Sequence, residues 1–213
     1  MPTAGDPPDE QLDDGPDAVE DHPESWPVLS TEDISRGDAP FAVRRDLVGD
    51  PRGETTFWRV VVEHPGAVVV LAVDDDERVL VLRQYRHPAG VRFVELPAGL
   101  LDKADEDPVE AARRELLEEA GVAAEDWTHL NTIHNSPGIS DERVEVYLAR
   151  DVREVPGRGG FVPEHEEADM SVGWVPFGEL LQAVLERRVT DGPLLTAVLT
   201  YAVRNGISGR ASL

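Results

Sequence analysis

The order of strand-like and helical segments constrains the fold of this chain more than any other sequence feature. Short runs rich in Val, Leu and aromatic residues, separated by turn residues, fill residues 41–99. One helical segment, further strand-like runs and two closing helical segments follow. Because a sheet needs its apolar faces covered, this order predicts an α/β (α+β) fold, in which helices enclose a mixed sheet.

Local sequence bounds the predicted elements. Strands are predicted at residues 41–48, 55–64, 67–73, 78–85, 91–99, 127–133, 143–150 and 170–175, and helices at 108–120, 177–188 and 193–206. The turn sequences GDPRG and DDDE each separate two consecutive strands and predict two hairpins. Since the first hairpin precedes the main unit, we expect a small N-terminal β subdomain.

Composition divides the chain into four regions. Residues 1–25 contain nine Asp or Glu, five prolines and no Lys or Arg, so we expect a disordered acidic tail. We expect N-terminal strands that are a candidate dimerisation element at 26–65, the main domain at 66–206, and a C-terminal tail at 207–213.

Charge and composition exclude several classes of function. The net charge of −23 argues against binding to nucleic acid or to anionic membranes, since both attract basic surfaces. The absence of cysteine excludes disulfides, zinc–thiolate sites and thiol nucleophiles. No apolar run approaches the roughly 18 residues of a membrane span, and the N-terminus lacks a signal-peptide pattern. We therefore expect a cytoplasmic protein.

The predicted helix at 108–120 has clear ends. Asp107 is a favourable N-cap, Pro108 suits the first helical position, and Glu110 completes a capping box. Gly121 follows the helix, where a left-handed residue is favoured. These signals fix the helix to within a residue or two.

The sides of this helix differ in character. The stripe predicted to face the core consists of Val109, Ala112, Leu116 and Ala120. Another side gathers Glu115, Glu118 and Glu119, with Ala111 between them. Arg114 can pair with Glu118, which leaves Glu115 and Glu119 without a helical counter-charge. Clustered carboxylates of this kind suit Mg²⁺ or Mn²⁺, although the same pattern also fits a solvated acidic face.

The helix lies in a longer motif. From Gly99 the chain reads GLLDKADEDPVEAARRELLEEAGV, which resembles the Nudix box of enzymes that hydrolyse nucleoside diphosphates linked to another group. The matching positions are Glu106, Arg114, Glu115, Leu116, Glu118, Glu119, Gly121 and Val122. The departure is the loop after Gly99, where six residues rather than five precede Glu106.

Other stretches resemble the ADP-ribose pyrophosphatase branch of that family. They are RQYRH (83–87), ELPAGLLD (95–102), SPGISDERVEVYLA (136–149) and HEEADMSVGW (165–174). Pro137, sixteen residues after Gly121, matches a proline that marks the branch. The resemblance implies a Nudix-like helix–mixed sheet–helix sandwich and Mg²⁺-dependent hydrolysis of ADP-ribose to AMP and ribose 5-phosphate, with Mn²⁺ as a substitute.

The resemblance also assigns candidate site residues. The metal set is Ala98, through its backbone, with Glu115, Glu118, Glu119 and Glu167; the catalytic set is Glu167, its neighbour Glu166, and Glu119. Arg86 and Glu95 are implied substrate contacts. Arg59 and Arg83 are candidate phosphate clamps, although each singly is better explained as an outward-facing strand residue. Trp58 is a candidate stacking partner for adenine across a dimer, although a strand aromatic more often belongs to the core.

Alternative functions stay open at this point. The substrate can be another nucleoside diphosphate sugar or a dinucleotide, because pocket shape decides between sugars. A non-catalytic module that senses ADP-ribose is a second alternative, and an acidic scaffold without a site is a third. The expected partners are a small nucleoside diphosphate sugar and a second copy of the chain, with neither nucleic acid nor membrane.

Overall fold

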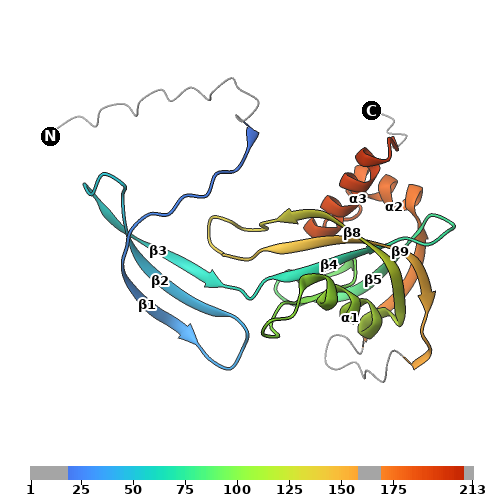
Figure 1. Ribbon diagram of the computed structural model, residues 1–213, viewed down its shortest axis with the longest axis horizontal. Helices are drawn as coiled ribbons and strands as arrows, with labels where there is room; N and C mark the ends of the chain where they lie inside the picture. Colours follow the sequence, from blue (N-terminus) through green and yellow to red (C-terminus); the bar gives the residue numbers. More distant parts are fainter. Residues whose placement is uncertain (1–18, 158–168, 209–213) are drawn as a thin grey trace.

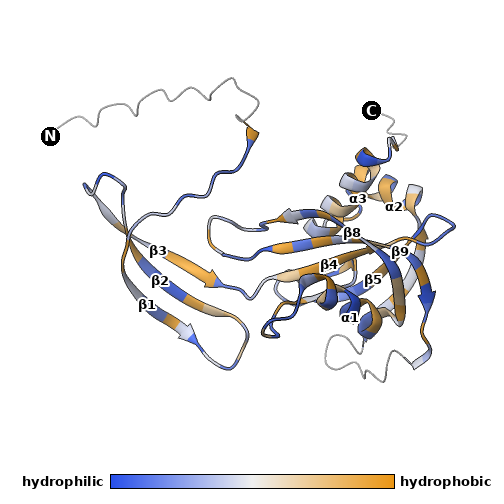
Figure 2. Cartoon of the chain, viewed as in Figure 1, coloured by the Kyte–Doolittle hydropathy of each residue, from blue (hydrophilic) through white to orange (hydrophobic). Residues whose placement is uncertain are grey.

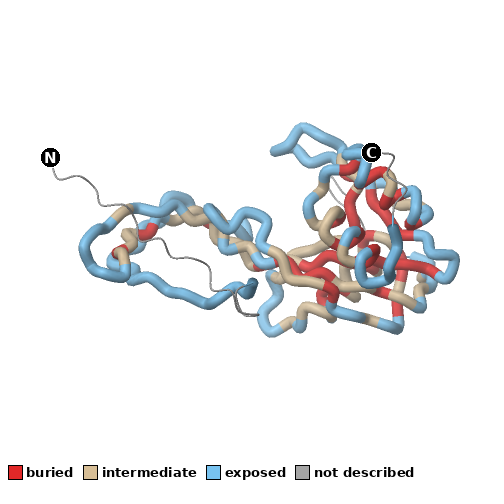
Figure 3. Tube along the Cα trace, turned by 90° about the horizontal axis from the view of Figure 1, so that it is seen from above, coloured by how far each residue is buried: buried red, intermediate tan, exposed pale blue. Residues whose placement is uncertain are grey.

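The computed structural model describes residues 19–157 and 169–208. Its N-terminal part is a three-stranded antiparallel sheet in the order β1–β2–β3. These strands are β1 (Val28–Arg36), β2 (Ala42–Gly49) and β3 (Thr56–Glu63). The sheet projects from the main body (Figure 1), and most of its residues are exposed or half-buried (Figure 3).

The main body contains two further sheets. One has the order β10–β5–β6, and the other has the order β7–β4–β9–β8. Their strands are β4 (Ala67–Ala72), β5 (Arg78–Arg86), β6 (Val91–Glu95), β7 (Ala98–Leu100), β8 (Val122–Ile133), β9 (Val144–Glu154) and β10 (Ser171–Pro176). β4 pairs with β9 in parallel and all other pairs in these sheets are antiparallel, so the second sheet is mixed.

Helices cover the sheets from both sides. α1 (Pro108–Ala120) packs on β4, β7 and β8, whereas α2 (Phe177–Leu185) and α3 (Gly192–Arg204) pack on each other and on the main body's sheets. None of the helices in the described ranges is long and apolar enough to cross a membrane. The predicted α/β helix–mixed sheet–helix sandwich, with a small N-terminal β subdomain, is confirmed.

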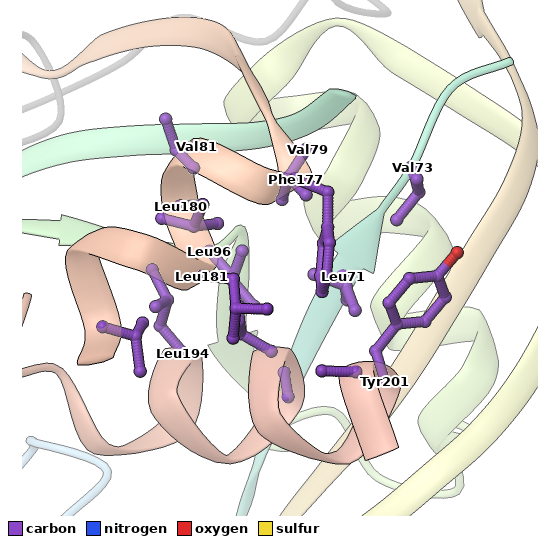
Figure 4. Close-up of a cluster of buried hydrophobic side chains, with 14 of the residues drawn as sticks. Leu71, Val73, Val79, Val81, Leu96, Phe177, Leu180, Leu181, Leu194 and Tyr201 are labelled. Carbon is purple, nitrogen blue, oxygen red and sulfur yellow. The ribbon is translucent and has the colours of Figure 1, made fainter. Parts of the chain in front are cut away.

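Strand β4 separates two cores because its side chains alternate between faces. Val69 and Leu71 join the core beneath α2 and α3, which also contains Leu180 and Leu194 (Figure 4). Val68 and Val70 join the core beneath α1. A strand buried on both faces is apolar along its whole length, which explains the uninterrupted run AVVVLA.

Three predictions at the level of single strands were wrong. β1 was missed because its nine residues, VLSTEDISR, are all exposed and show no clear apolar alternation. The predicted strand 91–99 divides into β6 and β7, which belong to different sheets, with Leu96 and Pro97 between them. β8 begins at Val122, directly after the C-cap of α1, rather than at residue 127.

The two predicted hairpins had different outcomes. GDPRG does turn β2 into β3, with Gly53 at a φ of 72° and its N–H donating to the Asp50 carbonyl. DDDE also turns the chain, but β4 and β5 enter different sheets, and an isolated bridge between Val73 and Val79 lies at the turn between them. Local sequence identified the turn, whereas pairing over long range decided the partners of each strand.

The two C-terminal helices were predicted correctly, but both end earlier than predicted. α3 begins at Gly192, after the N-cap Asp191, and ends at Arg204 rather than at residue 206. α2 ends at Leu185 rather than at residue 188, because Arg187 adopts a left-handed φ of 61° that stops the helix.

Figure 2 shows β3 to be hydrophobic along the half that approaches the main body.

Candidate functional site

The site is organised by α1, and its N-cap and C-cap form as predicted, whereas the Glu110 carboxylate pairs with Arg113 at 3.3 Å instead of completing a capping box. The Asp107 side chain accepts a hydrogen bond from the Val109 N–H at 3.0 Å, and Gly121 has a φ of 65°. Three residues on the inner side of α1, Ala111, Ala112 and Leu116, are completely buried. This packing holds the helix backbone, and therefore the origin of each glutamate side chain, in one position.

The acidic side of α1 does not face solvent, which corrects one expectation. Glu119 is 7% exposed and Ala111 is fully buried, whereas Val109 and Ala120 of the predicted core stripe are only partly buried. The buried face is therefore rotated toward Glu119. A solvated acidic face, the alternative left open by the sequence, does not describe Glu115 and Glu119.

Strand β7 passes so close to the Glu115 side chain of α1 that a Cβ at position 99 would fit only if this side chain moved. A Cβ added to Gly99 would lie 2.0 Å from Cδ and 2.1 Å from Oε1 of Glu115. Because glycine has no side chain, the Glu115 carboxylate can lie in the space that a Cβ at position 99 would fill. Next to it, the Ala98 N–H donates to Oε2 of Glu119 at 2.9 Å, which orients the second carboxylate.

Arg114 forms ion pairs with three carboxylates, those of Glu106, Glu115 and Glu118. Its Nη1 lies 3.2 Å from Oε2 of Glu118 and also contacts Oε1 of Glu115, while Nε and Nη2 contact Glu106 at 3.1 and 3.0 Å. The predicted pairing of Arg114 with Glu118 is present. The prediction that Glu115 lacks a counter-charge was wrong, because Arg114 reaches both of its acidic neighbours on the helix.

Electrostatics at Glu115 reflect this mixed environment. Burial raises the pKa of Glu115, and the positive charges of Arg114 and Lys103 oppose that rise. Hydrogen bonds to Glu106 are the first cause of the raised pKa of Arg114. A partly desolvated carboxylate is costly to keep ionised unless a cation is close, so the site favours positive charge.

A cleft of about 560 Å³ brings most of these groups together. Its walls include Arg86, Ala98, Gly99, Glu115 and Glu119. Volumes of this order are typical of small-molecule sites. A smaller cavity of about 230 Å³ also has Arg86 and Ala98 in its wall, together with Glu95 and Asp191.

Arg86 and Glu95 form an ion pair between neighbouring strands β5 and β6. Arg86 Nε donates to the two carboxylate oxygens at 2.9 and 3.1 Å, and Nη2 donates to Oε2 at 2.6 Å. Hydrogen bonding to Glu95 is the first cause of the raised pKa of Arg86. Glu95 is buried, whereas half of the Arg86 side chain is exposed, and its Nη1 makes no hydrogen bond within the described residues. Glu95 thus aims a guanidinium that keeps one edge available for an anion.

Three predicted substrate-binding residues lie away from this cleft in the single chain. Arg83 neighbours Gln84 on β5, but strand alternation sends its exposed side chain to the opposite face. Trp58 and Arg59 lie on β3 in the projecting sheet, where Arg45 stacks on Trp58 at 4.5 Å and Arg59 stacks on Phe57 at 4.6 Å. Glu166 and Glu167 lie outside the described residues.

The cleft also has walls that sequence reasoning did not assign. They are contributed by Phe41, His64, Gln84, Lys103 and Glu142, among others. The signal for Gln84 was its place in RQYRH, between the two arginines under consideration. Phe41 and His64 gave no such signal, because they come together through the pairing of β2 with β3, at the point where the chain continues into β4.

The donor set at α1 fits a divalent cation. Two carboxylates converge beside a backbone segment at Ala98 and Gly99, and hard oxygen donors of this type suit Mg²⁺ or Mn²⁺. Within the described ranges, no group of three or more His, Asp or Glu side chains is gathered around one point. Mg²⁺ typically takes one or two carboxylates and completes its shell with water and phosphate, so two are sufficient.

Comparisons with known proteins find relatives that match most of the chain. The family description "NUDIX domain" matches residues 63–197. An ADP-ribose pyrophosphatase of Mycobacterium tuberculosis is 46% identical over 184 residues, covering 85% of this chain and 86% of the relative. An ADP-ribose pyrophosphatase of Bacillus subtilis is 36% identical, covering 75% and 84%. The crystal structure of an ADP compounds hydrolase superposes with a TM-score of 0.70 at 18% identity, covering 89% of this chain and all of that one, which supports the fold.

Proposed function

The chain belongs to the Nudix family of hydrolases, and from this premise we propose that it hydrolyses the pyrophosphate of ADP-ribose to AMP and ribose 5-phosphate. One observation carries the proposal most directly. Carboxylates of Glu115 and Glu119 meet β7 at Ala98 and Gly99 in the same cleft as the Arg86 guanidinium. Cleavage of a phosphoanhydride needs this combination of cation ligands and a cationic phosphate contact.

The proposed metal ligands are the carboxylates of Glu115 and Glu119 and the backbone at Ala98, with Glu118 close to them and Glu167 completing the set. A bound divalent cation would neutralise phosphate oxygens and lower the pKa of a bound water. Mg²⁺ is the proposed ion and Mn²⁺ its substitute. The hydrogen bond from Ala98 N–H and the space at Gly99 support the roles of the two buried glutamates.

The protein's own groups bind and orient the substrate in this proposal. Arg86 contacts a phosphate through the guanidinium edge that Glu95 leaves unused. Glu95 acts on the substrate through Arg86, since its two oxygens are engaged by that guanidinium. Glu167, assisted by Glu166, is the proposed group that accepts a proton from the attacking water.

We further propose that the functional unit is a homodimer formed through the N-terminal sheet. Large apolar side chains on and beside this sheet are exposed: Trp26, Val28, Leu29, Ile34, Phe41, Trp58 and Val60. Soluble monomers rarely expose so many apolar groups on one small element. In the dimer, Trp58 and Arg59 would be brought to the partner's cleft, a role that the single chain does not give them.

A substrate panel tests the proposed reaction. Purified protein with Mg²⁺ is expected to release AMP from ADP-ribose much faster than from ADP-glucose or a nicotinamide dinucleotide, with products separated by chromatography. The Glu119→Gln variant should lose this turnover and bind Mn²⁺ more weakly in a titration without substrate. A reversed ranking of substrates would overturn the choice of ADP-ribose. Turnover without any divalent ion would overturn the proposal that the site acts through a bound cation.

Light scattering tests the dimer. The wild type is expected at twice the mass of the chain, and Val60→Asp should shift the protein toward the monomer.

The chain needs no oxidising compartment, because it has no cysteine, and we propose a cytoplasmic location.

A further inference from the structure

The cleft holds a third basic side chain besides Arg86 and Arg114. Lys103 lies in the loop between β7 and α1, is exposed, and contributes to the wall that also contains Glu115 and Glu119. It is the only lysine among the 213 residues.

The basic side chains of the cleft differ in what they already bind. Arg86 makes three hydrogen bonds to Glu95, and Arg114 pairs with Glu106, Glu115 and Glu118. Lys103 has no carboxylate within 4.0 Å in the described part of the chain, although three acidic residues lie within three positions of it. These residues are Asp102, Asp105 and Glu106.

The loop geometry accounts for this separation. The Glu106 N–H donates to the Lys103 carbonyl at 3.3 Å, which closes a turn over residues 103–106. Asp105 adopts a left-handed φ of 61° within that turn. The loop has one residue more than the usual Nudix pattern. Glu106 is directed to Arg114 instead of to Lys103, so the ammonium stays available at the mouth of the cleft.

We propose that Lys103 is a substrate-binding residue, whose ammonium contacts the non-bridging oxygens of the substrate's diphosphate. A diphosphate presents several anionic oxygens, and a compact ammonium with three donors can serve as a point contact to them. Lys103, in the loop between β7 and α1, would then contact the diphosphate in addition to Arg86, which lies on β5. The inference rests on the proposed hydrolysis of a nucleoside diphosphate.

The first test is kinetic and uses the full chain. Lys103→Met removes the charge but keeps the length of the side chain, and it should raise KM for ADP-ribose by about tenfold while kcat changes little. Lys103→Arg should retain most of the affinity. Arg153→Met is the matched control, because it removes one positive charge from an exposed position outside the cleft and should leave KM unchanged. Mn²⁺ binding without substrate should not weaken in Lys103→Met, since Lys103 is not an ion ligand.

The second test uses the fact that the chain has a single ε-amino group. Wild-type protein is acetylated with acetic anhydride, with and without α,β-methylene-ADP-ribose and Mg²⁺, and the peptide containing Lys103 is quantified by mass spectrometry. The rate of acetylation at Lys103 should fall about tenfold when the ligand is at roughly ten times its Kd. The rate of acetylation of the α-amino group of the same chain should not change.

Each outcome bears on one of the two claims. A wild-type KM in Lys103→Met, or acetylation of Lys103 that ignores the ligand, would overturn the role of Lys103 and leave the proposed function intact. Absence of turnover of any nucleoside diphosphate sugar by the wild type would overturn the proposed function. The protection experiment would still decide in that case whether Lys103 binds a diphosphate.

Discussion

Replacement of Gly99 by alanine should separate metal binding from stability. The added Cβ would lie 2.0 Å from Cδ of Glu115, whereas ordinary contact begins near 3.4 Å. The carboxylate must therefore withdraw by about 1.4 Å, the difference between these distances. A displacement of about 1 Å in a reacting geometry can cost a factor of about 10² in rate. We expect kcat/KM to fall at least about 100-fold.

The stability of the variant should change much less. The methyl group meets the end of a side chain that can rotate, and the backbone at Gly99 lies outside the left-handed region that disfavours alanine. Overpacking costs about 1–3 kcal/mol, and the smaller conformational entropy of the unfolded chain offsets about 0.4–1 kcal/mol of it. The free energy of unfolding should therefore decrease by at most about 2.6 kcal/mol.

Three measurements on the same protein provide the assay. Urea unfolding without metal gives stability, calorimetric titration with Mn²⁺ gives ion affinity, and release of AMP gives kcat and KM. Gly178→Ala is the matched control, since nothing lies within 4 Å of a Cβ at that position in α2. The control should be as active as the wild type. Wild-type ion affinity and activity in Gly99→Ala would refute the reasoning that Glu115 must occupy the space beside β7.

Three further changes test other parts of the structure. Arg86→Lys should lower kcat/KM about tenfold or more in the AMP assay, because an ammonium cannot hold Glu95 through two donors and still present a free edge to phosphate; an unchanged value would contradict this role. Burial raises the pKa of Asp191 from 3.8 to about 6. The folded protein thus binds the Asp191 proton more tightly than the unfolded chain does. The free energy of unfolding should therefore fall as pH rises from about 4 to 6, by at most about 3 kcal/mol. Asp191→Asn keeps a capping side chain for α3 and should flatten that slope in urea titrations at several pH values. Leu116→Ala should cost about 2–5 kcal/mol in the same titrations, because Leu116 is completely buried, and a cost below about 1 kcal/mol would argue against its place in the core.

The sequence by itself determined α1 and the type of chemistry on it. The N-cap Asp107, Pro108 and Gly121 act through hydrogen bonds and backbone preferences within a few residues, so their effects do not depend on the rest of the fold. The spacing of Glu115 and Glu119 likewise fixes two carboxylates on adjacent turns. The layered α/β architecture also followed from the order of apolar segments.

Only the tertiary structure decided which side of α1 is buried and what faces it. The contact of Gly99 with Glu115 joins β7 to the helix, and the pair of Arg86 with Glu95 joins β5 to β6. Strand partners were similarly undetermined, since β4 pairs with β9 across more than 70 residues of chain, although a tight turn joins it to β5. Such pairings depend on the burial of whole faces and on backbone hydrogen bonds to distant strands, which no local pattern encodes.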